Sequence, residues 1–211
     1  MSGQERKATS RPEPAASAGA AAATAASAAA SATHTREPII TRYTPAGGPP
    51  SQRPKRFTTP VVTPAVEAAR RAGIEYRLHE YEGVEHGEGD YALAVAQALG
   101  VEPSRLYKTL LASVDGKLEV FVLQADRRLD LRTIGKRVAM AERADAERAT
   151  GYVAGGISPL GQRKRLPTTV DETALDHETI LVSAGRRGLQ IELDPRDLAR
   201  LSDARVAAIA T

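Results

Sequence analysis

Residues 151–167 read GYVAGGISPLGQRKRLP, the most distinctive stretch of the chain. Four glycines fall within eleven of these residues, a Ser-Pro pair lies between the third and the fourth, and three basic residues follow. Neither a helical nor a strand period runs through the stretch, which predicts a loop. Adjacent glycines let backbone N–H groups approach a ligand, and successive amides can cradle an anion or a carbonyl oxygen. An ordinary surface loop made flexible by glycine explains the same composition.

Composition limits the remaining possibilities. The chain has 211 residues, enough for one domain with a core and a tail. It contains no cysteine, which excludes disulfides, thiolate metal sites and a cysteine nucleophile. The net charge of +3 divides into +5 for residues 1–57 and −2 for the remainder. Nucleic-acid binding by the folded part would therefore depend on local basic patches.

The first 57 residues are predicted to be a disordered tail. Residues 15–33 are almost wholly Ala, Ser, Gly and Thr, and they cannot bury enough apolar surface to offset the entropy of ordering. The alanine run is too weakly hydrophobic to favour a signal peptide or a membrane span. We therefore expect a cytoplasmic protein without a membrane role, with a folded domain over residues 58–211. A membrane-tethered form is the alternative, which cell fractionation would test.

The folded part reads as a mixture of helices and hairpin-connected strands. Asp115-Gly116 is a strong hairpin signal, and residues 185–188 are predicted to form a second hairpin turn. Strands that meet at hairpins favour a mixed, largely antiparallel sheet with helices outside it. Capping residues, among them Thr63, Asp90 and Asp194, predict helices over residues 64–73, 90–100, 130–139, 144–149 and 195–201. Leu93 is expected on the apolar face of the second of these helices. Period-2 patterns and apolar runs predict strands over residues 74–82, 106–114, 117–123, 167–170, 179–183 and 189–193.

Familiar catalytic patterns are missing from the sequence. There is no HExxH, no Cys/His cluster, no GxSxG elbow and no Walker A or Rossmann fingerprint, so neither a metal nor a cofactor is expected. Lys108, at the start of an apolar strand, has two interpretations. It could be an edge-strand charge that discourages aggregation, or a cation facing an anionic or carbonyl-bearing ligand near the glycine loop.

Four stretches in this order and spacing resemble the YbaK-type aminoacyl-tRNA deacylases, relatives of the editing domain of bacterial prolyl-tRNA synthetase. They are TPAV at 63–66, YKTLL at 107–111, GYVAGGISPLGQ at 151–162 and SAGRRGL at 183–189. The resemblance runs from Thr63 to about Ile209 and leaves out the tail. It implies a mixed α/β (α+β) fold with a curved, mostly antiparallel sheet surrounded by helices.

The resemblance also implies an activity and a site. The activity is hydrolysis of mischarged aminoacyl-tRNA, most typically cysteine on proline tRNA, without a cofactor, and the implied partner is prolyl-tRNA synthetase. In cysteine-specific relatives the substrate's own thiol is thought to expel the tRNA as a thiolactone. Lys108 matches the family's catalytic lysine. The implied substrate-binding residues are Tyr81, Thr109, Gly155, Gly156, Ile157, Ser158, Pro159, Ser183 and Gly188.

Two departures from the family pattern leave the edited amino acid open. Gln190 stands where cysteine-specific relatives carry aspartate, and Glu88 stands where they carry phenylalanine. Deacylation of alanine or another small residue, or a non-catalytic tRNA- or synthetase-binding module, are the alternatives. Candidates for gripping the tRNA backbone are Arg127, Arg128, Arg132, Lys136, Arg137, Arg163, Lys164, Arg165, Arg186 and Arg187.

Overall fold

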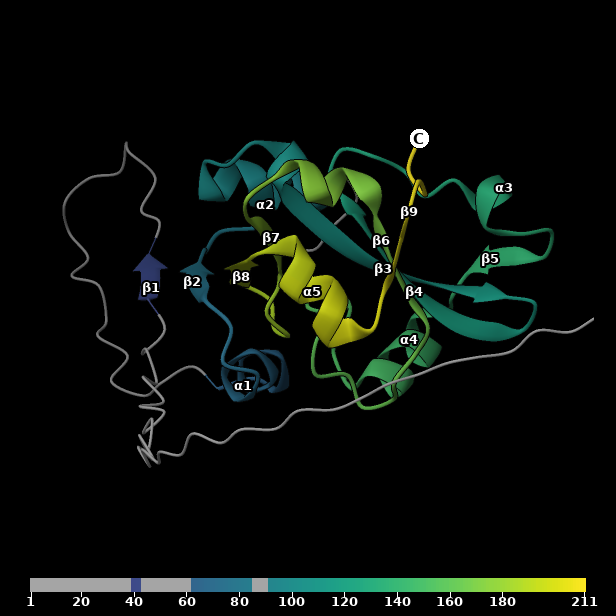
Figure 1. The fold of residues 1–211 in the computed structure, drawn as a ribbon, viewed down its shortest axis with the longest axis horizontal. Coiled ribbons are helices and arrows are strands. Elements are labelled where there is room, and N and C mark those ends of the chain that lie inside the picture. The colour runs from purple at the N-terminus through teal and green to yellow at the C-terminus, as the bar shows by residue number, and fades with distance from the viewer. Residues whose placement is uncertain (1–38, 43–61, 85–90) are drawn as a thin grey trace, which may run out of the picture. The chain divides into compact units, whose positions relative to one another are not determined.

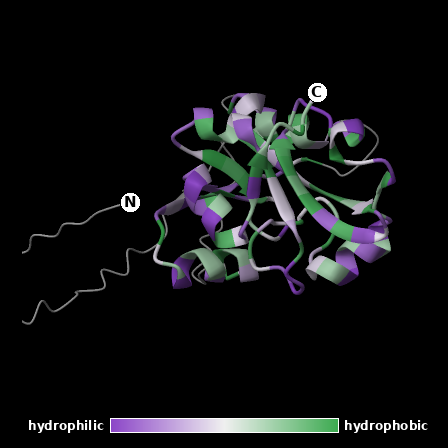
Figure 2. Cartoon of the chain, turned by 45° about the vertical axis from the view of Figure 1, so that its right-hand side comes forward, coloured by the Kyte–Doolittle hydropathy of each residue, from purple (hydrophilic) through white to green (hydrophobic). Residues whose placement is uncertain are grey.

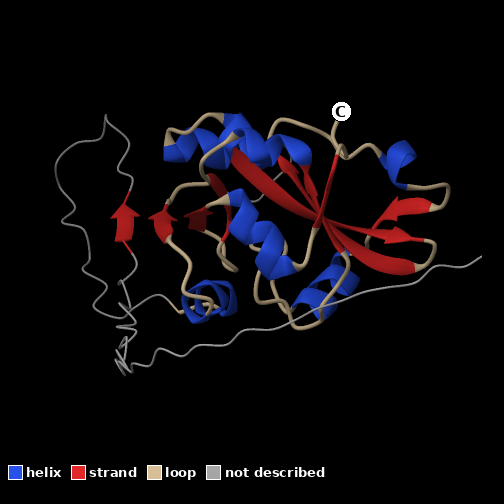
Figure 3. Ribbon diagram, in the orientation of Figure 1, coloured by secondary structure: helices blue, strands red, loops and turns tan. Residues whose placement is uncertain are grey.

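The computed structural model describes residues 39–42, 62–84 and 91–211. Its helices are α1 (Pro64–Arg71), α2 (Tyr91–Leu99), α3 (Leu131–Ile134), α4 (Arg143–Thr150) and α5 (Pro195–Ser202), with 3₁₀ helices at Pro103–Arg105 and Glu172–Asp176. Its strands are β1 (Ile39–Arg42), β2 (Tyr76–Glu80), β3 (Leu106–Val114), β4 (Lys117–Gln124), β5 (Val138–Met140), β6 (Thr168–Asp171), β7 (Ile180–Ser183), β8 (Leu189–Leu193) and β9 (Arg205–Ala207). Figures 1 and 3 show the helices arranged around one sheet.

The sheet is mixed, as the sequence predicted. Its described strands follow the order β1-β2-β8-β7-β3-β4-β6-β9, with β5 pairing β3 beside this path. The hairpins β3–β4 and β7–β8 are antiparallel, as are β2–β8 and β3–β5. The pairs β1–β2, β3–β7, β4–β6 and β6–β9 are parallel. Antiparallel pairing therefore holds the longest strands, while the parallel pair β3–β7 joins the two hairpins to each other.

Local sequence signals explain most element ends. The Thr63 hydroxyl caps α1 by accepting the N–H of Val66, and Pro64 occupies the first turn. Asp194 caps α5 in the same way through the N–H of Arg196. Asp115 and Gly116 both have positive φ, at 50° and 83°, as a type I′ hairpin turn requires. These predictions are confirmed.

Three features differ from the sequence-based expectation. The helix predicted over residues 130–139 is wrong beyond Ile134, because Gly135 ends it and Val138, a β-branched residue, pairs with Val114 in β5. Leu93 was expected on the apolar face of its helix but is 37% exposed. The backbone of β1 forms a strand within the segment predicted to be disordered, and the domain boundary at residue 57 stays a prediction. Glu88 and Asp90, as well as the tail apart from β1, lie outside the described residues.

The two faces of the sheet are covered differently. Helices α1, α4 and α5 pack on one face, where alternate strand residues such as Val120, Val122 and Ile191 form the largest core cluster. On the other face α2 covers Leu106 and Leu181, while Phe121 and Leu123 pack beneath Ile209 and Ile134. Figure 2 shows hydrophobic colour along the strands and hydrophilic colour at many turns. The second face therefore carries two separate apolar clusters, and the candidate site lies between them.

Candidate active site

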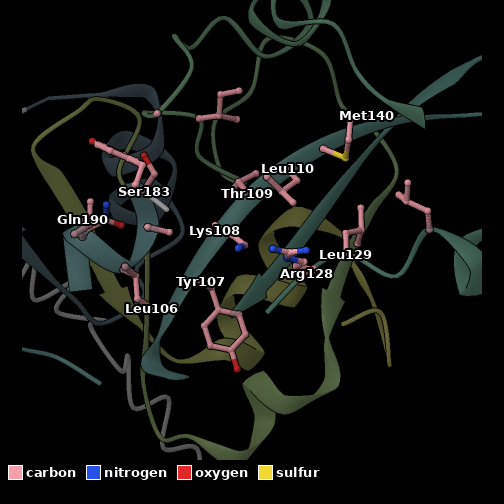
Figure 4. Close-up of a pocket in the computed structure, with 16 residues that line it drawn as sticks. Leu106, Tyr107, Lys108, Thr109, Leu110, Arg128, Leu129, Met140, Ser183 and Gln190 are labelled. Atoms are coloured by element: carbon pink, nitrogen blue, oxygen red, sulfur yellow. The ribbon is translucent and has the colours of Figure 1, made fainter. Parts of the chain in front are cut away.

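A pocket of about 500 Å³ opens on the face of the sheet that α2 partly covers. At one end it contacts α2 and strands β7 and β8, and at the other it contacts β5 and the segment after β4. Strand β3 runs between the two ends (Figure 4). The residues that line the pocket are Tyr91, Ala92, Val95, Leu106, Tyr107, Lys108, Thr109, Leu110, Arg128, Leu129, Leu131, Met140, Gly155, Ile157, Ser183 and Gln190.

Strand register brings three polar residues of this pocket together. Ser183 of β7 pairs with Gln190 of β8, and Tyr107 of β3 pairs with Val182, so Lys108 and Ser183 are the next residues along their strands. Successive strand residues point to opposite faces, and the neighbours Val182, Leu189 and Ile191 all belong to the core on the far face. Lys108, Ser183 and Gln190 therefore share the face that the pocket occupies.

Lys108 is partly buried and held by a backbone carbonyl. Its ammonium group donates to the Ala125 carbonyl oxygen at 2.8 Å. Ala125 in turn donates its N–H to the Leu106 carbonyl oxygen at 2.7 Å, which ties the end of β4 to β3. The charge of Lys108 therefore sits at a fixed place beside a largely apolar wall (Figure 4). A cation in such surroundings acts more strongly on a nearby developing charge than it would in water.

Gln190 carries a polar group that the surrounding protein does not satisfy. The residue is 5% exposed, and its Oε1 accepts no hydrogen bond from the described part of the chain. The Oγ1 of Thr109 is likewise buried without a partner among the described residues. Such groups in a native fold call for an explanation, because burying an unpaired polar atom costs about 1–3 kcal/mol. Gln190 shares the pocket face with Lys108, so a ligand there could supply its missing partner, whereas alternation along β3 places the Thr109 side chain on the other face.

Glu192 lies two residues after Gln190 in β8, and its buried polar group, unlike that of Gln190, has hydrogen-bond partners. Its carboxylate accepts hydrogen bonds from His79 at 2.7 Å, from Thr179 at 2.6 Å and from Arg105 at 2.9 Å. The hydrogen bond from His79, supported by those from Thr179 and Arg105, lowers the pKa of Glu192 to about 2. This cluster is internally complete and does not line the pocket.

Tyr81 is connected to the site by a hydrogen bond to a second tyrosine, Tyr91. It is 5% exposed and does not line the pocket, but its hydroxyl lies 3.0 Å from that of Tyr91, which does. Burial, followed by the hydrogen bond with Tyr81, raises the pKa of Tyr91. The Tyr91 phenol is therefore neutral near pH 7 and can act as a hydrogen-bond donor. Tyr91 is a pocket residue that the sequence interpretation missed.

The glycine loop works mainly through close backbone packing. A Cβ on Gly161 would lie 2.4 Å from the Pro64 carbonyl, and one on Gly156 would lie 2.9 Å from the backbone of Arg186 and Arg187. The Gly156 N–H donates to the Val153 carbonyl oxygen at 2.9 Å, so it is already used within the loop. The loop therefore fits against the start of α1 and against the β7–β8 turn, where only glycine allows this approach.

The same junction explains why the first, third and fourth sequence motifs occur together. The Thr63 hydroxyl donates to the Ala184 carbonyl oxygen at 2.5 Å, and the Tyr152 hydroxyl donates to the Leu160 carbonyl oxygen at 2.8 Å. A Cβ on Gly185 would lie 2.6 Å from the Tyr152 ring. Each motif thus supplies a surface that the other two require.

Five of the ten predicted site residues line the pocket and five do not. Those in the lining are Lys108, Thr109, Gly155, Ile157 and Ser183. Ser158 is fully buried, with its Oγ accepting the N–H of Leu160, and Pro159 is buried beside it. The Gly188 carbonyl oxygen accepts the N–H of Tyr81 at 3.1 Å. Ser158, Pro159, Gly156, Gly188 and Tyr81 therefore surround the site as supports.

Four of the basic residues proposed to grip tRNA already contact other parts of the domain, two of them through the ion pairs Arg137–Asp115 at 2.8 Å and Arg165–Asp203 at 3.2 Å. Arg187 donates its Nε–H to the Ala154 carbonyl oxygen at 2.9 Å, while Glu147 accepts the Ala154 N–H at 2.8 Å. This clamp fixes the residue that precedes Gly155 in the pocket wall. Arg186 forms an ion pair with Glu80 at 2.9 Å.

The segment after β4 contributes pocket residues that the sequence interpretation did not identify. Arg128 appeared only among candidates for backbone contacts, yet it lines the pocket, and its guanidinium group reaches toward Lys108 (Figure 4). Met140, 47% exposed, directly follows the segment predicted to be helical and was not assigned to a site. The predicted helix over 130–139 concealed this wall, because only the pairing of β5 with β3 brings Met140 opposite Ala112.

No group of three or more His, Cys, Asp or Glu side chains in the described ranges could hold a metal ion. Within the same ranges, no helix has both the length and the apolar character needed to cross a membrane.

Sequence comparison with known proteins gives the family that the four sequence motifs resemble. The sequence model of the aminoacyl-tRNA editing domain matches residues 86–201, more than half of the chain. The chain is 36% identical over 156 residues to a protein of Enterococcus faecalis (strain ATCC 700802 / V583) named "Putative Cys-tRNA(Pro)/Cys-tRNA(Cys) deacylase EbsC". This match covers 71% of the chain and 93% of the relative.

Solved structures give the same fold. One is the crystal structure of "a putative trans-editing enzyme for prolyl tRNA synthetase", with a TM-score of 0.60, 24% identity and coverage of 72% of this chain and 99% of that one. Another is that of the hypothetical protein APE2540, with a TM-score of 0.60, 25% identity and coverage of 71% and 100%. On the sequence matches, the chain belongs to the aminoacyl-tRNA editing domain family.

Proposed function

We propose that this chain deacylates mischarged tRNA in trans, with cysteinyl-tRNA(Pro) as its substrate and prolyl-tRNA synthetase as its partner in the cytoplasm. Editing of aminoacyl-tRNA follows from family membership. The name of the Enterococcus relative supports the finer choice of cysteine. The observation that carries the proposal is the placement of Lys108 between the Ser183–Gln190 wall and Arg128 in an otherwise apolar pocket.

An aminoacyl ester is an activated bond, so positioning and electrostatics can supply most of the catalysis. The chain contains no cysteine, and Ser158 is buried with its Oγ bonded to the backbone, so neither offers a protein nucleophile. The proposed nucleophile is the substrate's own thiolate. Its sulfur forms a bond to the ester carbonyl carbon, the C–O bond breaks, and the terminal ribose oxygen of the tRNA leaves and takes a proton. The products are free tRNA and a cysteine thiolactone, which water then opens.

Lys108 has the clearest role in this scheme. Its positive charge, fixed by the Ala125 carbonyl, stabilises the negative charge that develops on the ester oxygens. Removing one such electrostatic contact typically costs 10²- to 10³-fold in kcat. Lys108 would be a catalytic residue in the strict sense, because it would touch the reacting atoms.

Gln190 and Ser183 are placed to hold the aminoacyl group. The unpartnered Oε1 of Gln190 can accept a hydrogen bond from the substrate's α-ammonium group. A neutral amide attracts an ammonium group less strongly than a carboxylate does. Deacylation of alanine, which has no thiol and would need water as the nucleophile, is the second candidate, and the presence of Gln190 in place of the aspartate of cysteine-specific relatives is the feature that favours it.

The deciding experiment measures deacylation of tRNA(Pro) charged with cysteine, alanine or proline, by wild type, Lys108→Ala and Lys117→Ala. Lys117 lies on the exposed side of the β3–β4 turn and serves as the charge-matched control. We expect selective loss of cysteine, abolished in Lys108→Ala and unchanged in Lys117→Ala. Loss of alanine instead of cysteine would make alanyl-tRNA(Pro) the substrate. If none of the three amino acids is released, the proposal is overturned. Added prolyl-tRNA synthetase should speed the reaction if it is the partner.

A further inference from the structure

Asp171, the last residue of β6, is only 2% exposed, and the proposed mechanism does not use its carboxylate. Each carboxylate oxygen accepts two hydrogen bonds. Oδ1 accepts the N–H of Thr173 at 3.2 Å and the hydroxyl of Thr173 at 2.5 Å, while Oδ2 accepts the N–H groups of Ile209 and Ala210, both at 3.0 Å. Burying a carboxylate is costly unless donors surround it in this way. One buried group therefore fixes two separate segments of the chain.

The bonds on Oδ1 lead to the strand that carries Lys108. The Thr173 hydroxyl gives its one proton to Asp171, so the Tyr107 hydroxyl, 3.0 Å away, donates to the Thr173 Oγ1. Burial raises the pKa of Tyr107 to about 12, so the phenol keeps this proton near neutral pH. Tyr107 lines the pocket and directly precedes Lys108 in β3 (Figure 4). The position of the lysine along its strand is thereby tied to Asp171.

The bonds on Oδ2 lead to the pocket wall that follows β4. Residues 209–211 form three backbone hydrogen bonds, of 2.8, 2.9 and 3.1 Å, with residues 128–130, and Leu129 forms a bridge with Ala210. Leu129 and Arg128 line one end of the pocket (Figure 4). Asp171 therefore holds the segment against which this wall is paired.

We propose that Asp171 is a positioning residue for deacylation, which holds Lys108 through Oδ1 and the wall of Arg128 and Leu129 through Oδ2. The inference rests on the proposed function, because it assigns Asp171 a part in that reaction. A small displacement of a reacting group by a change far from the chemistry can cost a large factor in rate. Glu192 is also buried and fully bonded, but none of its three partners lines the pocket. Asp171 differs because both of its oxygens lead to residues that do.

Three substitutions in the full chain separate the two oxygens. Thr173→Val removes the hydroxyl between Asp171 and Tyr107. Ala210→Pro removes the N–H that donates to Oδ2, while the three backbone bonds to residues 128–130 use other groups. Asp171→Asn disturbs both sides, because a single amide oxygen replaces two carboxylate oxygens.

Two controls separate positioning from a general loss of stability. Val170→Ala shortens a buried side chain next to Asp171, and it lowers stability without removing any of these hydrogen bonds. Asp194→Asn changes another capping aspartate, at α5, which does not line the pocket. Urea denaturation first establishes that every variant is folded under the assay conditions. The measurements are kcat and KM for the aminoacyl-tRNA(Pro) that wild type deacylates fastest, and amide hydrogen exchange of residues 128–130 by mass spectrometry.

We expect the two oxygens to affect different quantities. Thr173→Val should lower kcat by about fivefold and leave KM within about twofold of wild type, because Lys108 acts on the ester during the reaction. Ala210→Pro should raise KM by about fivefold, because the wall is no longer preformed, and should speed exchange at residues 128–130 by about tenfold. Asp171→Asn should lower kcat/KM by about tenfold. Both controls should keep the wild-type kcat, KM and exchange rates.

Wild-type kcat and KM in both Thr173→Val and Ala210→Pro would overturn the inference. Equal kinetic changes in Val170→Ala would also overturn it, because lower stability alone would then explain them. If wild type deacylates no aminoacyl-tRNA, the proposed function fails, and exchange at residues 128–130 still tests whether Asp171 holds the wall. Faster exchange in Ala210→Pro and Asp171→Asn would then support that placement, and unchanged exchange would overturn it.

Discussion

Gln190 and Glu192 lie two residues apart on the same face of β8, and both are more than nine-tenths buried, at 5% and 9% exposure. Glu192 accepts hydrogen bonds from three side chains, whereas the Gln190 Oε1 has no partner in the described part of the chain. A buried polar group with a full set of partners stabilises the fold, and one without them weakens it. The difference therefore separates the residues that hold this domain together from those left available to a ligand.

The same division runs through the glycine loop. Gly156 and Gly161 are fitted tightly against backbone, while Gly155 and Ile157 face the pocket. Substitutions on the two sides of this division should therefore disturb different properties, folding stability on one side and deacylation on the other.

Gly161→Ala should lower the free energy of unfolding by about 3 to 5 kcal/mol, because its Cβ would overlap the Pro64 carbonyl at 2.4 Å. Gly73→Ala is the matched control. Its φ of 67° is close to the 65° of Gly161, but a Cβ there would meet no atom within 4 Å. We expect the control substitution to lower the free energy of unfolding by only about 1 to 2 kcal/mol, the conformational cost of an alanine at positive φ. Urea denaturation measures both variants, and equal losses would show that close packing at Gly161 is unimportant.

Glu192→Gln should lower the free energy of unfolding by about 2 to 3 kcal/mol at pH 7, because His79 and Arg105 lose their carboxylate partner. The pKa of Glu192 is lowered to about 2 from 4.5. Its stabilising contribution is therefore complete above about pH 4.5 and is lost as the pH falls toward 2. Urea denaturation of both proteins between pH 7 and pH 3 should show their stabilities converging as the solution becomes more acidic. A difference that stays constant with pH would mean that the carboxylate is not the cause.

Gln190→Leu should leave the stability unchanged or raise it by up to about 1 kcal/mol, since an unpaired buried amide is replaced by an apolar group. Deacylation should fall by about 10- to 100-fold in kcat/KM, because the α-ammonium group of the substrate loses its acceptor. Gln124→Leu is the control, since Gln124 is also buried but donates to the Ser104 carbonyl and does not line the pocket. It should lose about 1 kcal/mol of stability and keep its activity. The reverse pattern in the two variants would contradict the division between them.

A structural feature could be predicted from the sequence where the residues that determine it lie close together along the chain. The Thr63 cap and the Asp115-Gly116 turn act within a few residues, and both were predicted correctly. The motif around Lys108 located one side of the pocket because the lysine lies within the strand that forms its floor.

Long-range pairing is what the sequence could not provide. Gly156 was expected to present an amide to a ligand, but the tight contact that explains it involves Arg186 and Arg187, thirty residues away. Met140 reaches the pocket only because β5 pairs with β3, and the first two residues of β5 were predicted to be helical. Arg187 was expected to contact tRNA because a basic residue in a turn gives no sign that its donor is already used.

Arg187→Ala has the smallest expected effect and tests the clamp on Ala154. Losing the hydrogen bond to the Ala154 carbonyl should cost less than about 1 kcal/mol of stability, because the arginine is exposed. It should lower kcat/KM by about three- to tenfold, because Gly155 in the pocket wall is held less firmly. Arg186→Ala, which breaks only the ion pair with Glu80, is the control and should keep its activity.

The length of the substrate then distinguishes the clamp from a tRNA contact. If Arg187 positions the loop, the loss should be the same for full-length aminoacyl-tRNA and for a short aminoacylated acceptor-stem hairpin, at low and at high salt. If Arg187 instead binds the tRNA backbone beyond the acceptor end, the short substrate should be unaffected, and the loss for full-length tRNA should shrink as salt rises, since phosphate contacts are screened. The hydrogen bond to Ala154 predicts the first pattern, because the Nε–H that a phosphate would use already points to the loop.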